Sequence, residues 1–373
     1  MKVPFCDLTR DERETFIDGK NVEEIINENI MKAREKKDYV LGGFTREFEE
    51  NFAKYCGTKY CIGVGSGLAG LELSLRSLGI GQNENDEVIT VANTFNATAA
   101  AINKVGANVV LADCGEDYNI DVERVEKEIS RRTKAIMPVH LYGKIADVKG
   151  LEKFGVPIIE DACQAHGAIF ENQRAGSFGV AGAFSFYPGK NLGGIGDGGA
   201  IVTNEEGLNN FLREARNYGQ IEKYNHATFP DNSRLDNIQA AALVPKLGVL
   251  DEWNGKRMKN ALQYYENLSE VDEILIPEKN FEKEHVYHLY VIQSQERDEL
   301  SKYLNESGIQ TGLHYPIPIH LQKSFAENGY RKGDFPNSER LSERILSLPM
   351  FPTLKNEEIN YVSNKIKEFY SKK

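Results

Sequence analysis

The chain has 373 residues, a hydrophobic content of 40% and a formal net charge of −11. This length and composition predict about two domains around a sizeable core, as in a soluble globular enzyme. The acidic balance argues against a nucleic acid as the main partner, because binding to a duplex needs a positive surface field.

Cysteine usage and hydropathy give no sign of a metal, a disulfide or a membrane. The five cysteines are scattered, and they form no C-x-x-C pair and no Cys/His spacing typical of a zinc site. No apolar core of a secretory signal follows Met1, and no apolar run approaches the ~20 residues that span a bilayer. We therefore expect a cytoplasmic protein with reduced thiols.

Short apolar strands alternate with helices in the first half of the chain. Two early segments, residues 22–30 and 44–55, have helical spacing of apolar residues. The expected strands cover residues 60–64, 87–91, 108–112, 135–139 and 156–159, and the expected helices begin near residues 68, 98 and 122. This alternation predicts an α/β fold with a mostly parallel central sheet and helices on both faces.

The second half of the chain changes character. A strand at residues 200–203 precedes a long helical region at 236–268, in which Pro245 is expected to cause a kink. A strand at residues 287–292 and a helix at 297–307 follow. We predict a large cofactor-binding domain at residues 1–245 and a smaller C-terminal α+β domain at residues 246–373.

Lys190 is the most informative residue because of its neighbours. It lies between Ser185 and a glycine run at residues 193–199, and a strand-like stretch ending on Asp161 precedes it. A pyridoxal 5'-phosphate (PLP) site needs these groups: a lysine that bonds to the aldehyde, an acid that keeps the pyridine nitrogen protonated and a serine for the phosphate. An isolated lysine is usually a solvated surface charge, but these neighbours favour PLP.

A phosphate site is expected at residues 65–68, between a strand and a helix. Exposed amides at a helix N-terminus favour a dianion, Gly67 allows close approach and Ser66 can donate its hydroxyl. The same segment fits the dinucleotide fingerprint G-x-G-x-x-G. In a dehydrogenase an acid about 20 residues later ends a strand and binds ribose, whereas Asp86 and Glu87 begin one. A dehydrogenase and a purely structural turn remain as alternatives.

Three residues are candidates for contacts with the cofactor ring. Asp161 stands at the carboxyl end of a strand, where parallel sheets bind ligands, and Gln164 is placed to meet the phenolic oxygen. Phe95 follows another strand and could stack on the ring. The alternatives are a helix N-cap for Asp161 and a core position for Phe95.

Taken together, these motifs resemble a known family. The segments that carry the resemblance are residues 66–67, 93–95, 138–143, 160–167, 184–199 and 232–236. They are similar to those of PLP-dependent sugar-nucleotide aminotransferases of the DegT–DnrJ–StrS type, which have the fold-type-I aminotransferase architecture. The match runs in consistent order from residue 3 to residue 350, nearly the whole chain.

The resemblance implies a role for each matching residue. Lys190 would be the covalent attachment point of PLP and the proton shuttle, Asp161 would pair with the ring nitrogen, and Gln164 would contact the ring hydroxyl. Phe95 would stack on the ring. In this family an asparagine of the second subunit also reaches the phosphate, and Asn232 matches it, so the resemblance implies a homodimer with a shared active site. The phosphate would be held by Ser66, Gly67, Leu68 and Ser185.

Within the family, the chain looks closest to 3-aminotransferases that act on dTDP-linked 3-keto-6-deoxyhexoses. The segments that carry this finer resemblance are residues 67–68, 186–190, 217–219 and 313–318. In that subgroup, residues that match Tyr187, His314 and Tyr315 line the sugar pocket. The resemblance implies L-glutamate as amino donor, pyridoxamine 5'-phosphate as the amino form of the cofactor and a role in lipopolysaccharide or glycan biosynthesis. Without it, packing beside a proline-rich loop would explain His314 and Tyr315. Pro230 stands where the family usually has glycine, so the loop that carries Asn232 is expected to differ in shape from that of the family.

Several related functions compete with this assignment. A sugar-nucleotide 4-aminotransferase of the same family shares every catalytic residue. A sugar 3-dehydratase carries histidine in place of the lysine, so Lys190 favours transamination. A non-catalytic regulatory paralogue could bind PLP as a sensor.

Overall fold

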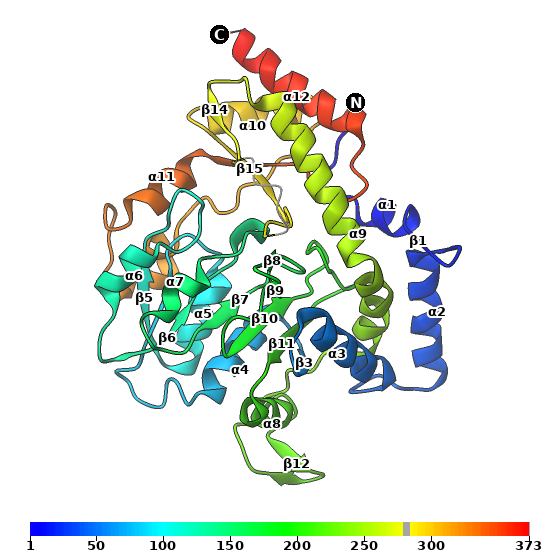
Figure 1. Cartoon of the computed structure of the whole chain (residues 1–373), viewed down its shortest axis with the longest axis vertical. Coiled ribbons are helices and arrows are strands. Elements are labelled where there is room, and N and C mark those ends of the chain that lie inside the picture. The colour runs from blue at the N-terminus through cyan, green and yellow to red at the C-terminus, as the bar shows by residue number, and fades with distance from the viewer. Residues whose placement is uncertain (279–283, 373) are drawn as a thin grey trace.

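The computed structural model describes residues 1–278 and 284–372, and its centre is a mostly parallel sheet (Figure 1). Strands β5, β4 and β6 pair in parallel, and bridges from Ile136 to Ile158 and from Val139 to Asp161 join β6 to β7. Next come β10, which is parallel to β7, then β11, which is antiparallel to both neighbours, and β3 at the edge. The strands are, in sheet order, β5 (Asn108–Ala112), β4 (Glu87–Val91), β6 (Thr133–Met137), β7 (Ile159–Asp161), β10 (Ala181–Ser185), β11 (Gly199–Thr203) and β3 (Tyr60–Val64).

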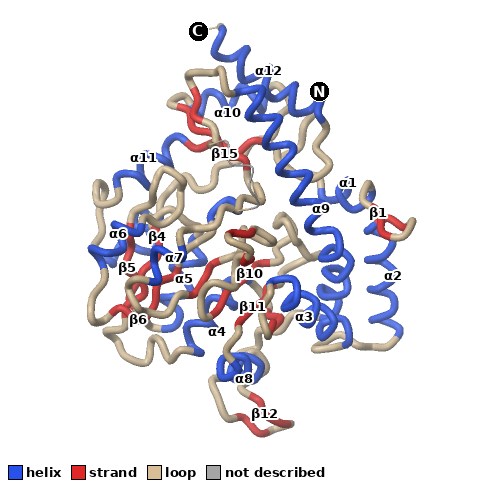
Figure 2. Tube along the Cα trace, in the orientation of Figure 1, coloured by secondary structure: helices blue, strands red, loops and turns tan. Residues whose placement is uncertain are grey.

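Helices cover both faces of this sheet, as Figure 2 shows. Val88 of β4 packs in one apolar cluster with α4 (Gly67–Ser77) and α5 (Asn96–Val105). Ile89 of the same strand faces the other way, toward α6 (Val122–Glu128) and α7 (Val148–Glu152). Because successive side chains of a strand point to opposite faces, a strand buried on both sides is apolar throughout. The predicted α/β class and helix layers are confirmed.

A second helical layer closes the face next to β10 and β11. Helices α2 (Val22–Glu35) and α3 (Gly43–Cys56) pack beside the long α9 (Asn237–Leu268), which runs on through Pro245. Phe52 of α3 meets Phe184 of β10 edge-on, with ring centroids 5.0 Å apart. This layer supports the strand that leads to Lys190.

The far half of α9 belongs to a smaller α+β unit. The antiparallel strands β14 (Ile274–Leu275), β15 (Tyr290–Ser294) and β16 (Ile345–Leu348) share its core with α10 (Arg297–Glu306) and α12 (Asn356–Ser371). Val3 bridges to Ile309, so the N-terminal segment also lies against this unit. The domain division at residue 245 stays a prediction, and residues 279–283 and 373 of its second part lie outside the described residues.

The remaining elements connect these parts. The hairpin of β12 and β13 projects beyond α8 at the bottom of Figure 1. These elements are α1 (Leu8–Arg13), β1 (Phe16–Ile17), β2 (Lys20–Asn21), β8 (Ile169–Phe170), β9 (Gln173–Arg174), α8 (Glu206–Ala215), β12 (Gln220–Glu222), β13 (Asn225–His226), α11 (Pro336–Arg344) and the 3₁₀ turns Leu141–Gly143, Ile319–Leu321 and Lys323–Asn328. Across the described ranges, no helix combines the length and the apolar character needed to cross a bilayer.

Three strand predictions need correction. The strand expected at residues 135–139 is β6, at Thr133–Met137, and it ends before Pro138, which has no N–H to donate to a ladder. The strand expected at residues 156–159 begins only at Ile159, because Pro157 has no N–H to donate to a ladder. The strand expected at 287–292 is β15, at Tyr290–Ser294, since Tyr287 has a positive φ of 43° that breaks an extended run.

Candidate active site

The predicted site residues follow the carboxyl ends of strands that run in the same direction in the sheet. Ser66 follows β3, Phe95 follows β4, Asp161 ends β7, and Ser185 ends β10 with Lys190 five positions later. Parallel strands present these ends at one edge of a sheet, where α/β proteins bind their ligands. The topology therefore gathers these residues at a common edge.

Asp161 is a buried carboxylate, 5% exposed, held by two hydrogen bonds. Its Oδ2 accepts from Thr98 Oγ1 at 2.8 Å, and its Oδ1 accepts from the Cys163 amide at 3.2 Å. Residues 162–168 form turns, so the helix N-cap alternative is wrong. A buried anion held by neutral donors suits a cationic partner such as a protonated pyridine ring.

Lys190 is half-buried in a turn, with its amide donating to the Tyr187 carbonyl at 2.9 Å. Burial lowers the pKa of the Lys190 ammonium, and the acidic groups Cys163 and Asp161 act in the opposite direction. A lowered pKa raises the fraction of free amine near neutral pH, which a proton-transferring base requires.

The Gln164 side chain has its amide orientation fixed by two partners. Its Oε1 accepts from the Tyr142 amide at 2.8 Å, and its Nε2 donates to the Tyr315 hydroxyl at 3.2 Å. Tyr142 adopts a φ of 58°, which aims this amide at Gln164. The NH₂ group of Gln164 is thereby placed on the side of Tyr315, as expected of a donor to a phenolic oxygen.

Aromatic side chains gather beside Gln164. Phe95 is 54% exposed and its ring lies 5.3 Å from that of Tyr315, so a core position for Phe95 is wrong. The half-buried His314 meets Tyr315 edge-on at 5.6 Å. Burial, reinforced by the Lys190 charge, lowers the pKa of His314 to about 4, so its imidazole is neutral near pH 7. Tyr187 is 59% exposed on the Lys190 turn.

The N-terminus of α4 has the features of a phosphate cradle. Ser66 caps this helix through its Oγ, which accepts from the Ala69 amide, and Ser185 Oγ accepts from the Tyr187 amide. Both hydroxyl protons therefore remain available for an anion. A Cβ on Gly67 would lie 2.7 Å from Cys163 Sγ and 2.8 Å from Ser185 Cβ, so glycine is required for this close approach. The first amides, including that of the half-buried Leu68, and the helix dipole favour a dianion here.

Asn232 lies on an exposed loop next to this cradle. It bridges to Asn217, and the neighbouring Ser233 packs beside Gly65, where an added Cβ would lie 3.4 Å from Ser233 Oγ. Its predicted contact with the phosphate of a partner subunit stays a prediction.

The acid next to Asp161 has a different environment. Glu160 is fully buried and bonds to His140 Nε2 at 2.8 Å. Its carboxylate also accepts from the amides of Gly176, Phe178 and Gly179, each at 2.7 Å. Glu160 therefore braces the turns behind the sheet, and Asp161 alone of the two faces the Lys190 side.

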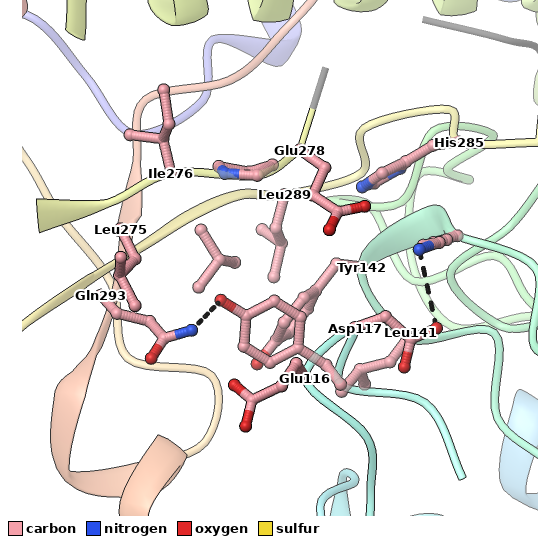
Figure 3. A pocket seen from close by; sticks show the side chains of 14 residues that line it. Glu116, Asp117, Leu141, Tyr142, Leu275, Ile276, Glu278, His285, Leu289 and Gln293 are labelled. Atoms are coloured by element: carbon pink, nitrogen blue, oxygen red, sulfur yellow. Dashed lines mark hydrogen bonds and ion pairs between the residues drawn. The ribbon is translucent and has the colours of Figure 1, made fainter. Parts of the chain in front are cut away.

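Tyr142 is one of the residues that line a cavity of 470 Å³ (Figure 3). Tyr118, Tyr142, His285 and Gln293 contribute to its wall, and Gln293 Nε2 donates to the Tyr118 hydroxyl at 3.1 Å. Neither Lys190 nor Asp161 lines it, so it is separate from the predicted PLP site. Within residues 1–278 and 284–372, no group of three or more His, Cys, Asp or Glu side chains is arranged to hold a metal ion.

These residues fit PLP in charge and in shape. A buried carboxylate, an amine of lowered pKa and a cradle for a dianion converge at one sheet edge. Three contributors were not foreseen from the sequence: Thr98, Tyr142 and Ser347, which bonds to His314. Thr98 follows Thr94 by one helical turn, and this spacing was the available signal.

Comparisons with known proteins find relatives along nearly the whole chain. The model of the DegT/DnrJ/EryC1/StrS aminotransferase family matches residues 20–367. A dTDP-3-amino-3,6-dideoxy-alpha-D-galactopyranose transaminase of Aneurinibacillus thermoaerophilus is 42% identical, over 98% of this chain and 99% of its own length. A pleiotropic regulatory protein of Geobacillus stearothermophilus is 40% identical over 99% of both chains. The crystal structure of S. venezuelae DesV in complex with a ketimine intermediate superposes with a TM-score of 0.94, at 40% identity over 99% of this chain and 98% of that one.

Proposed function

Because this chain belongs to the DegT/DnrJ/EryC1/StrS aminotransferase family, we propose that it transfers an amino group from L-glutamate to carbon 3 of a dTDP-linked 3-keto-6-deoxyhexose. The chain is a PLP-dependent aminotransferase of the fold-type-I architecture. The observation that carries the choice of substrate is the 42% identity, over nearly the full length of both chains, to a transaminase named for a dTDP-3-amino sugar. The amino sugar would serve the assembly of a glycan.

Lys190 is the proposed base of both half-reactions. PLP, when bound, supplies an aldehyde for the amine and an electron-accepting pyridine ring. The Lys190 Nζ takes the proton from the α-carbon of glutamate in the first half-reaction. In the second, it delivers a proton to the sugar carbon that gains nitrogen. One amine can do both because its lowered pKa keeps the free base accessible near neutral pH.

Asp161 is the proposed partner of the ring nitrogen. Its carboxylate is buried, and Thr98 and the Cys163 amide hold both of its oxygens. A negative charge fixed in this way stabilises the protonated ring and so its capacity to accept electron density. Gln164 would donate to the ring hydroxyl, and Phe95 would cover one ring face.

The sugar is proposed to lie against the aromatic rim formed by Tyr187, His314 and Tyr315. A neutral His314 can hydrogen-bond a sugar hydroxyl without the cost of desolvating a charge. Tyr187 is exposed and available for a ligand.

We further propose that the enzyme works as a homodimer in the cytoplasm. The exposed Asn232 loop and the projecting β12–β13 hairpin are the surfaces offered to a second copy. All five cysteines are free, which favours a reducing compartment. A titration of the freshly isolated protein that finds fewer than five thiols would argue against this location.

The function is tested by incubating the PLP-loaded enzyme with L-glutamate and a panel of 3-keto and 4-keto sugar nucleotides. We expect amination of a dTDP-3-keto-6-deoxyhexose, with nitrogen on carbon 3 by NMR, and loss of at least about 10³-fold in kcat for Lys190→Ala. Lys59→Ala is the control, since this lysine lies outside the site on a turn before β3. Nitrogen on carbon 4 would instead identify a 4-aminotransferase, and amination of no sugar would refute the assignment.

A second candidate is a non-catalytic PLP-binding regulator, favoured by the 40% identity to a pleiotropic regulatory protein. A regulator of this kind would bind PLP and stay yellow in the presence of glutamate. Bleaching of the yellow form by glutamate, with release of 2-oxoglutarate, would exclude it.

A further inference from the structure

His314 stands between the active site and the small unit, and its ring is held from several sides. Its carbonyl accepts a hydrogen bond from the Tyr142 hydroxyl, and its ring meets Tyr315 edge-on. Burial, followed by the positive charge of Lys190, lowers the pKa of this imidazole. The ring orientation therefore determines which imidazole atom a substrate meets.

One imidazole nitrogen is occupied by a buried serine. His314 Nδ1 lies 2.8 Å from Ser347 Oγ, and Ser347 on β16 is 1% exposed. Rotation of the ring by 180° would replace Nδ1 with a carbon and leave the hydroxyl without this partner, at the cost of a buried hydrogen bond. Ser347 thus selects one of the two ring orientations.

Packing also holds the plane of the ring. Phe5 of the N-terminal segment stacks on the imidazole, with centroids 5.6 Å apart and planes 22° from parallel. On Gly312, a Cβ would lie 2.6 Å from His314 Cε1, so this glycine leaves room for the ring. Gly312 also exchanges two backbone hydrogen bonds with Ser347, which fixes the loop to β16.

The chemical consequence concerns the second nitrogen. With Nδ1 engaged by Ser347, Nε2 is the ring nitrogen left for a ligand. Near pH 7 the imidazole is neutral, so the identity of this nitrogen as donor or acceptor is set by the bond that Nδ1 makes.

We propose that Ser347 is a positioning residue for the sugar half-reaction: it holds His314 with Nε2 toward the keto sugar nucleotide, while Phe5 supports the ring from behind. This inference rests on the proposed sugar-aminotransferase function. It predicts that Ser347 matters for the sugar and not for glutamate, because none of its contacts reaches Lys190 or Asp161.

The orientation is tested first without any substrate, by ¹⁵N NMR of the PLP-loaded enzyme labelled on histidine. The chain has seven histidines, and His314→Gln identifies the signals of interest. In the wild type we expect the ¹⁵N chemical shifts of the two His314 ring nitrogens to be those of a single neutral tautomer. In Ser347→Ala both chemical shifts should move toward the average of the two tautomers. Unchanged His314 signals in Ser347→Ala would overturn the proposal.

The functional consequence is tested by measuring the two half-reactions separately. Ser347→Ala should raise KM for the keto sugar about threefold to tenfold, the range that one hydrogen bond supplies, and leave the glutamate half-reaction within about twofold of the wild type. Ser347→Cys, with a weaker partner of similar size, should give an intermediate KM. Phe5→Leu should raise the same KM without changing the glutamate step.

A matched control separates positioning from stability. Ser294→Ala removes another buried hydroxyl of the same small sheet, which bonds to Tyr370 at 2.6 Å and does not contact His314. Ser294→Ala should change the melting temperature but leave the KM for glutamate and the KM for the keto sugar unchanged. An equal loss in both half-reactions of Ser347→Ala would overturn the positioning role, as would an unchanged sugar KM. If the wild type aminates no keto sugar, the function itself fails, and the nitrogen spectra alone decide whether Ser347 orients the ring.

Discussion

Thr98 connects the cofactor acid to the helix behind it. Its hydroxyl donates to Asp161 Oδ2 at 2.8 Å and lies 3.0 Å from Thr94 Oγ1. The Thr94–Thr98–Asp161 chain is buried throughout, so no water replaces a lost member at low cost. We therefore expect Thr98, together with the Cys163 amide, to set the direction of the Asp161 carboxylate and with it the predicted site of the ring nitrogen.

Thr98→Val should weaken PLP binding, because a hydrogen bond to a charged group is worth about 1.5–3 kcal/mol and only part of that energy is recovered on relaxation. We expect the Kd for PLP, measured by equilibrium dialysis, to rise roughly tenfold. Thr98→Ser keeps the hydroxyl and should restore most of the affinity.

Thr94→Val is the matched control, since it removes the first bond of the chain but leaves the contact with Asp161 intact. Its PLP affinity should stay within about threefold of the wild type. Equal affinity in Thr98→Val and the wild type would show that Thr98 does not orient the acid.

At the level of single residues, the sequence predicts site residues that belong to a distinctive local motif. It does not predict residues that reach the site only through tertiary contacts. Lys190 and Asp161 could be predicted because an amine, an acid and a glycine run follow one another within a short stretch. Ser347 could not, since it meets His314 across 33 positions through a strand pairing that no local pattern encodes. Their roles in catalysis stay predictions until the variants are measured.

At the scale of elements, apolar runs with sharp borders gave the most accurate predictions. The expected strands at 60–64, 87–91 and 108–112 have the observed bounds of β3, β4 and β5. Strand β10 was not expected, because Ala181, Gly182 and Ala183 carry too little apolar surface to give a strand pattern. The small residues of β10 allow α4 to pack closely on this strand. A Cβ added to Gly70 of α4 would lie only 3.3 Å from Ala183 Cβ.

The hairpin formed by β12 and β13 exposes large apolar side chains to solvent. It extends from the body of the molecule, and it exposes Ile221 by 59% and Tyr224 by 83%. Apolar side chains displayed on a projecting hairpin are typical of a surface that is covered in an oligomer.

Replacing both residues, Ile221→Asp with Tyr224→Asp, should shift the protein from dimer to monomer and reduce PLP affinity, because charges oppose burial in an interface. Sedimentation velocity would measure the change, with Lys223→Gln on the same hairpin tip as control. A wild type that sediments as a monomer would contradict the proposed dimer, and an unchanged dimer in the double variant would exclude the hairpin from its interface.

At the scale of the whole molecule, buried neutral histidines link folding to pH. Burial, reinforced by nearby cationic side chains, lowers the pKa of His166 and His285 to about 3 and that of His314 to about 4. In the unfolded chain these groups take up protons as the pH falls through about 6.5. Between pH 6.5 and pH 4 the unfolded state therefore binds more protons than the folded state, and the free energy of unfolding decreases as the pH falls.

Each such histidine should contribute up to about 1.4 kcal/mol per pH unit to this loss. We expect the free energy of unfolding in urea to fall steeply from pH 6.5 to pH 4.5. His285→Gln removes one histidine that is protonated only in the unfolded state. The free energy of unfolding of this variant should therefore depend less steeply on pH, by up to about 1.4 kcal/mol per pH unit. Above pH 7.5 the variant and the wild type should show nearly the same dependence. Parallel slopes for wild type and variant would refute the assignment.

The two adjacent acids at the end of β7, Glu160 and Asp161, point to opposite faces of the sheet. Since neighbouring side chains of a strand face opposite ways, Glu160 is committed to four hydrogen bonds behind the sheet and Asp161 to the ligand side. Inserting a single residue upstream in β7 would move Glu160 into the place of Asp161 and still aim a carboxylate at the predicted coenzyme site. It would, however, strip three amides and an imidazole of their acceptor, so charge would be conserved while the scaffold collapsed. Neither acid can therefore take the place of its neighbour, even though both carry the same functional group.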